Sequence, residues 1–97
     1  MQNLNTIKTA EDLKNLPISD VWLKIDKSDK YHIKRDTKNC FMLSDSEFYC
    51  GSIIKNKKKY IVAATLHNLS YELDFETLEK AFDFLIEKAK TIYIKEK

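Results

Sequence analysis

Two histidines and two cysteines are the residues of this sequence best suited to bind a metal or to attack a substrate. They are His32, Cys40, Cys50 and His67, so the spacings are 8, 10 and 17 residues. None of these spacings matches the short Cys–Cys or His–His spacing of zinc sites. Cys40 and Cys50 each lie within an apolar run, where a thiol behaves as a small hydrophobic group. We therefore expect neither a metal site nor another cofactor.

Nucleophilic catalysis would require a Ser or Cys beside a His and an orienting carboxylate. No nucleophile elbow or glycine-rich loop surrounds Cys50, His32 or His67, and Gly51 is the only glycine of the chain. The sequence therefore predicts a protein that is not an enzyme. An enzyme or metalloprotein centred on one of these three residues remains a hypothesis, ranked third after the two binding functions described below. Metal analysis of the pure protein would test it.

The elements that would position any site begin with a short helix over residues 10–16. Thr9 and Asp12 form a variant of the capping box, and Pro17 ends the segment. From Val21 onward the period is two, and six short pieces rich in aromatic and branched side chains alternate with turn-like segments. Such brief links indicate antiparallel hairpins, because a parallel crossover needs a dozen or more residues. We expect a meander of about five or six strands.

The C-terminal segment returns to a helical period. Apolar residues at positions 78, 81, 82, 85, 86, 89 and 92 line one face, and Thr77 or Asp74 is suited to cap the start. The sequence thus predicts a single α+β domain over residues 1–97. In it, a short N-terminal helix and a long C-terminal helix accompany an antiparallel meander sheet, and the long helix packs on one face of the sheet.

The segment "LDFETLEKAFDFLIEKA", residues 73–89, resembles the strand-then-helix ending of many small, mostly uncharacterised prokaryotic and phage proteins. The matching residues are structural, so the resemblance supports the fold and implies no active site. In its short, Lys- and Asn-rich composition without catalytic motifs, the chain is also similar to anti-CRISPR inhibitors, which share no common motif. This resemblance is one of overall style.

Composition favours an intracellular protein. The apolar runs are far shorter than the roughly 18 residues of a membrane-spanning helix, and the N-terminal segment has no apolar region typical of a signal peptide. We expect a cytoplasmic location, in the host cell if the protein is encoded by a phage, and no membrane association.

The net charge is +2 and the sequence pI about 8.5, and Arg35 is the only arginine among 17 basic residues. This lowers the expectation of sequence-specific DNA binding.

Trp22 is the first candidate for a binding residue. It alternates with Val21, Leu23 and Ile25, so it lies on the outer sheet face if those three face a helix. Trp and Tyr dominate interface hot spots, although a tryptophan of a small domain is more often a core residue. We expect a non-enzymatic inhibitor or adaptor that binds another protein through Trp22, Tyr31, Tyr49, Lys55, Lys57, Lys58 and Lys59.

A nucleic-acid-binding module is the alternative function. The lysines at 55 and 57–59 flank Asn56, which tolerates the left-handed conformation of a tight hairpin turn. A solvated turn is the simpler interpretation. The lysines would form a functional surface if this turn lay at the same end of the sheet as the basic residues of the neighbouring hairpins. The set for this alternative is Lys24, Lys27, Lys30, Lys34, Arg35, Lys57, Lys58, Lys59 and Tyr60.

Overall fold

Seven β-strands and two α-helices make up residues 6–45 and 47–90, the part of the chain that the computed structural model describes. The strands are β1 (Thr6–Ile7), β2 (Leu23–Ile25), β3 (His32–Thr37), β4 (Cys40–Ser44), β5 (Tyr49–Asn56), β6 (Lys59–Leu66) and β7 (Leu69–Phe75). The helices are α1 (Ala10–Lys14) and α2 (Leu78–Ala89). Neither helix of these ranges has the length and hydropathy to span a bilayer.

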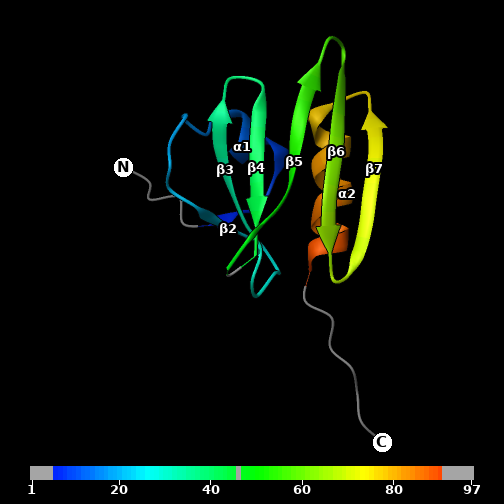
Figure 1. Ribbon diagram of the computed structural model, residues 1–97. Helices are drawn as coiled ribbons and strands as arrows, with labels where there is room; N and C mark the ends of the chain where they lie inside the picture. Colours follow the sequence, from blue (N-terminus) through cyan, green and yellow to red (C-terminus); the bar gives the residue numbers. More distant parts are fainter. Residues whose placement is uncertain (1–5, 46, 91–97) are drawn as a thin grey trace, which may run out of the picture.

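All seven strands belong to one curled sheet whose strand order equals the chain order (Figure 1). From β2 to β7 every neighbouring pair is antiparallel, as expected for strands joined by short turns. The strand count exceeds the predicted five or six because β1 pairs in parallel with β2 through Thr6 and Ile7. Two residues show no periodicity, so the sequence pattern gave no sign of this strand.

Two hairpin turns of two residues each fix the register of β5, β6 and β7. Asn56 pairs with Lys59, and Lys57 rather than Asn56 has the positive φ of 59°. The predicted left-handed conformation at Asn56 was therefore wrong by one residue. In the next hairpin His67 and Asn68 have φ of 50° and 70°, which is typical of a type I′ turn.

The alternation of side chains gives the sheet two different faces. The inner face carries side chains with no exposed surface, among them Ile33, Leu43, Ile53 and Val62, which form the core. Figure 1 shows both helices on this side, with α2 behind β6 and β7. The outer face carries no other element within the described ranges. The predicted covering of one face by the C-terminal helix therefore applies to the β6–β7 part of the sheet.

Helix α2 is amphipathic, and its buried residues are Leu78, Ala81, Phe82, Leu85 and Ala89. The hydroxyl of Thr77 accepts a hydrogen bond from the Lys80 N–H at 3.1 Å and so caps the first turn. The helix has 12 residues and ends at Ala89, which is shorter than the long helix expected from the sequence. The last apolar position of that expectation, Ile92, lies outside the described residues.

Helix α1 has the predicted capping box. Thr9 Oγ1 accepts from the Asp12 N–H at 3.2 Å, and the Asp12 carboxylate accepts from the Thr9 N–H at 3.2 Å. The helix ends at Lys14, two residues earlier than predicted, but Leu13 and Leu16 are both buried as expected. The chain after the helix is held by the guanidinium of Arg35, which places α1 against one end of the sheet.

Candidate interaction surface

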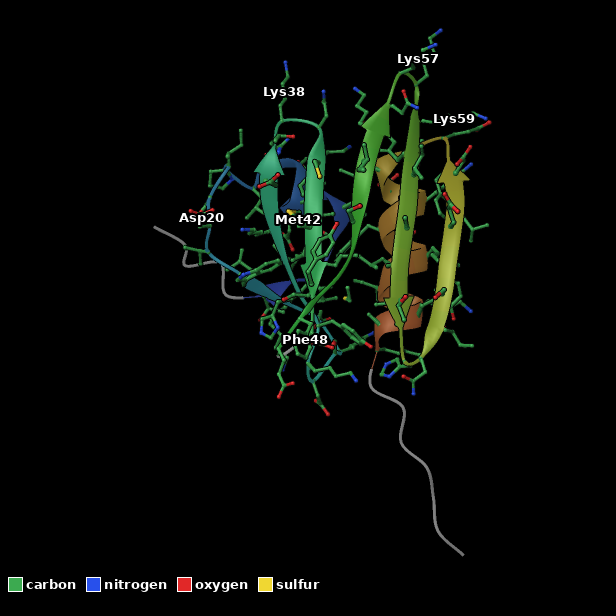
Figure 2. All side chains as sticks on the ribbon, viewed as in Figure 1. Asp20, Lys38, Met42, Phe48, Lys57 and Lys59 are labelled. Carbon is green, nitrogen blue, oxygen red and sulfur yellow. The ribbon has the colours of Figure 1, made fainter. Side chains whose placement is uncertain are left out.

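The outer sheet face has an apolar centre. Met42 on β4 pairs with Ser52 on β5, and the next outward pair is Cys40 with Ile54. Ile54 is 42% exposed, whereas its neighbour Ile53 on the inner face is fully buried. In Figure 2 Met42 lies midway between Lys38, at one end of the sheet, and Phe48, at the other. The exposed side of the sheet thus offers a largely apolar strip that runs between the Lys38 end and the Phe48 end.

A hollow with a volume of about 350 Å³ lies at the Phe48 end of this strip. Three large side chains that line it are exposed: Trp22 (36%), Phe48 (70%) and Tyr49 (58%). We call this hollow the aromatic depression. The other residues that line it are His32, Ser44, Asp45 and Glu47.

Trp22 is held in place by charged neighbours. The Nζ atom of Lys34 lies 4.9 Å from the centre of the indole ring, and the same atom lies 3.5 Å from Asp20 Oδ1. The Lys34 side chain is only 17% exposed, so the cation–π contact is partly shielded from water. The Lys34 contact therefore orients the indole, whereas Asp20, whose side chain is fully exposed, adds little.

Phe48 is positioned by the turn before β5. The Asp45 carboxylate accepts hydrogen bonds from the backbone N–H of Phe48 at 2.7 Å and of Glu47 at 2.8 Å, and the Asp45 N–H donates to the Phe48 carbonyl at 2.9 Å. The Phe48 bond first, and then the Glu47 bond, lower the pKa of Asp45. Protonation of Asp45 in acid would weaken the turn that presents Phe48.

Two of the residues predicted to bind a partner, Trp22 and Tyr49, therefore lie together. Tyr31 does not belong to this surface, because it is 3% exposed and its hydroxyl accepts a hydrogen bond from the His67 backbone N–H. The sequence analysis also missed Phe48, the most exposed of the aromatic residues in the depression. Phe48 stands next to Tyr49 at the start of an apolar run, and the alternation of side chains in the sequence did not mark it as a binding residue.

The predicted lysines lie at the opposite end of the sheet. Because neighbouring strands are antiparallel, the β5–β6 turn shares its end with the β3–β4 turn, and the connection before β3 lies at the other end. Figure 2 shows Lys57 and Lys59 at one end and Phe48 at the other. Lys55 faces inward from β5, with its Nζ atom 5.8 Å from the Tyr60 ring centre.

The structure also separates the residues of the nucleic-acid alternative. Lys27 and Lys30 precede β3, so they lie at the end of the sheet away from Lys57, Lys58 and Lys59. The remaining basic residues of the set divide between the two faces. Lys24 and Lys34 lie on the outer face with Trp22, whereas Arg35 lies inward, over the ring of Phe41. Tyr60 is half-buried beneath Lys55. The condition for one continuous basic end is therefore not met.

The histidines and cysteines occupy separate places. The His32 ring is within 3.1 Å of the Lys30 carbonyl, and the His67 ring contacts carbonyls at the end of α2. Burial raises the pKa of Cys50 to about 11 and, with the nearby charge of Asp36, also raises that of Cys40. Among residues 6–45 and 47–90, no cluster of three or more His, Cys, Asp or Glu is arranged to hold a metal ion.

Comparison with known proteins found no matching protein-family model, no curated protein and no solved structure with significant similarity. A functional inference for this chain rests on the geometry of its own residues.

Proposed function

We propose that the protein is a binding module, acting as an inhibitor or adaptor, that docks on another protein through the aromatic depression and the adjoining outer sheet face. The observation that carries the proposal is the convergence of three exposed aromatic side chains, Trp22, Phe48 and Tyr49, on one hollow. Tryptophan and tyrosine supply much of the binding energy at protein interfaces when they are buried in a central pocket.

The depression is arranged before binding. Lys34 holds the indole of Trp22, and Asp45 fixes the backbone of Phe48. Side chains and loops that are already ordered lose less entropy when a complex forms, so more of the contact energy remains as affinity. This distinguishes the depression from scattered exposed residues such as Leu69 on β7, which are normal on a protein surface.

The rim of the depression indicates the chemistry of the partner. Asp45 and Glu47 lie beside the aromatic rings. Among the described residues that line the hollow none is a lysine or arginine, although Lys34 lies over the Trp22 ring and Lys30 is close enough to Asp45 to lower its pKa. An apolar side chain of the partner would fill the hollow, and a neighbouring lysine or arginine would face these two acids. The adjoining strip around Met42 would extend the contact beyond the hollow.

Site-specific crosslinking tests the proposal. A photoreactive phenylalanine analogue replaces Phe48 in one variant and Leu69 in a matched control, since both side chains are at least 60% exposed but lie on different surfaces. In nuclease-treated cell extract we expect one protein to crosslink at position 48 and not at position 69. Equal crosslinking at both positions, no crosslinked protein, or a signal that disappears with nuclease would contradict it.

Binding to the recovered partner is then measured directly. Trp22 is the only tryptophan of the chain, so its fluorescence reports on the depression itself. F48S/Y49S should weaken the affinity at least tenfold, because hot-spot truncations exceed about 2 kcal/mol. L69S/L73S removes two exposed apolar side chains of β7 and should leave the affinity unchanged.

Two expectations from the sequence belong with this proposal. An anti-CRISPR-like role is its most concrete form, supported by the stylistic resemblance described above and tested if the crosslinked partner is a CRISPR effector. Nucleic-acid binding is the competing function, and the nuclease arm of the experiment separates the two. The cytoplasmic location stays a prediction.

A further inference from the structure

Four cationic side chains converge on one small cavity at the end of the sheet opposite the aromatic depression. They are Lys14 at the end of α1, Arg35 on β3, Lys38 in the β3–β4 turn and Lys55 on β5. The cavity has a volume of about 170 Å³, and its lining within the described part of the chain includes no aspartate or glutamate. Figure 2 shows Lys38 at this end of the molecule. We call this cavity the cationic pocket.

The centre of the cationic pocket is rigid. Arg35 Nη1 donates to the Leu16 carbonyl at 2.9 Å, and Nη2 donates to the Lys38 carbonyl at 2.9 Å. The guanidinium carbon lies 5.1 Å from the ring centre of Phe41. These contacts fix the direction of the guanidinium group but bring no negative charge to it. Its Nε atom is buried without a hydrogen-bond acceptor.

Within residues 6–45 and 47–90, no ion pair with a carboxylate neutralises the lysines of the pocket. Among the described residues, the ion pairs of lysine with carboxylates use Lys34, Lys80 and Lys90, none of which lines this cavity. Four like charges on three elements and a turn repel one another, and Arg35 is partly shielded from water. A bound anion would remove this repulsion and accept hydrogen bonds from the cationic groups that line the cavity.

We propose that the cationic pocket binds the phosphate group of a small phosphomonoester or inorganic phosphate. A phosphate dianion matches the excess positive charge, and its oxygens accept from arginine and lysine together. The cavity is equivalent to roughly five or six water volumes and is smaller than pockets for whole drug-sized ligands. It therefore holds the phosphate group, while the remainder of an ester extends outside it.

A nucleic-acid strand fits this arrangement less well. Strand-binding proteins place cations along a groove and stack bases on a series of aromatic side chains. Here the cations converge on one volume, and Phe41 is buried beneath Arg35.

The cationic pocket uses residues away from the aromatic depression, so phosphate binding is independent of the proposed protein docking.

The test is a ¹H–¹⁵N NMR titration of the full chain at constant ionic strength with inorganic phosphate, adenosine monophosphate and an oligonucleotide without terminal phosphates. We expect saturable shifts of the amides of residues 14, 38, 39 and 55 with the first two. Tighter binding of adenosine monophosphate would identify an ester as the ligand, and equal binding would identify phosphate itself. Tighter binding of the oligonucleotide at these residues, or shifts that do not saturate, would overturn the proposal.

Matched lysine variants locate the site. K14Q/K38Q/K55Q removes three charges from the pocket and keeps Arg35, whose contacts with backbone carbonyls support the fold. K24Q/K58Q/K80Q removes three charges elsewhere and has the same net charge. The pocket variant should bind phosphate roughly tenfold or more weakly, and the control variant within about twofold of the natural chain. Equal losses in both would show attraction by net charge alone and would overturn the assignment.

Discussion

The hydroxyl of Tyr31 accepts a hydrogen bond of 2.7 Å from the backbone N–H of His67, a residue 36 positions later. The two rings also meet edge to face, with centres 5.3 Å apart. The His67 ring in turn lies 3.0 Å from the Lys90 carbonyl, just after α2. A buried tyrosine thus connects the start of β3, the β6–β7 turn and the end of α2.

Replacement of Tyr31 by phenylalanine should lower the free energy of unfolding by about 1–2 kcal/mol, because the His67 N–H loses its acceptor. Urea denaturation followed by circular dichroism measures the change. Tyr49→Phe is the control, since Tyr49 is 58% exposed, and it should remain within about 0.5 kcal/mol of the natural chain. Equal effects of the two variants would contradict a structural role for the Tyr31 hydroxyl.

Gly51→Ala should be strongly destabilising. An added Cβ would lie 2.5 Å from the Ala63 carbonyl oxygen and would overlap the Cβ of Ala64 on the adjacent strand. Since β5 and β6 would have to separate, we expect a loss of about 3 kcal/mol or more. Ser52→Ala, at the next position, adds no atom and should lose less than about 1.5 kcal/mol in the same denaturation experiment. Full stability of the Gly51 variant would refute this close approach of strands.

Thr77→Ala should lower the stability by about 1 kcal/mol, because the Lys80 N–H at the start of α2 loses its cap. Thr77→Ser keeps the hydroxyl and should restore most of this loss. Thermal unfolding of the three proteins makes the comparison. If the serine variant were as unstable as the alanine variant, the methyl group of Thr77 rather than its hydroxyl would be the stabilising feature.

Cys50 should react slowly with iodoacetamide at pH 8, and its rate should rise steeply toward pH 11. Burial first, and the charge of Asp45 second, raise the pKa of this thiol from its ordinary 9.0 to about 11. The unfolded thiol ionises first, so the contribution of Cys50 to stability is complete below pH 9 and is lost as the pH rises toward 11. Cys50→Ala should show a smaller fall in stability over this interval. Rapid alkylation of Cys50 at pH 8 would contradict its partly buried position.

The alternation of side chains was sufficient to predict much of the sheet. It placed Trp22 opposite Val21, Leu23 and Ile25, and the structure has the indole on the outer side beside Lys34. Val21 does not follow the pattern, because it precedes β2 and is 63% exposed. It also placed Tyr31 in phase with the buried Ile33, so the burial of Tyr31 was already implied by its position. Tyr31 was nevertheless assigned to the binding surface, because tyrosine is common at protein interfaces, and this assignment was incorrect.

Other features depend on contacts through space. The cationic pocket joins Lys14 to Lys55, and no local pattern relates two residues 41 positions apart. The two-residue strand β1 is likewise defined only by its pairing with β2. The end of the sheet at which each lysine lies follows from strand direction, which becomes known only when every turn has been assigned correctly.

The equality of sheet order and chain order has a consequence for synthesis. Each strand from β3 to β7 can pair with the strand made immediately before it, so nearly all strand contacts are local and folding should be fast for a sheet of this size. The inner face of β6, including Val62 and Leu66, nevertheless waits for α2 before it is covered. A nascent chain that stops before residue 78 would therefore expose the apolar surface of an incomplete core to chaperones and to other nascent chains.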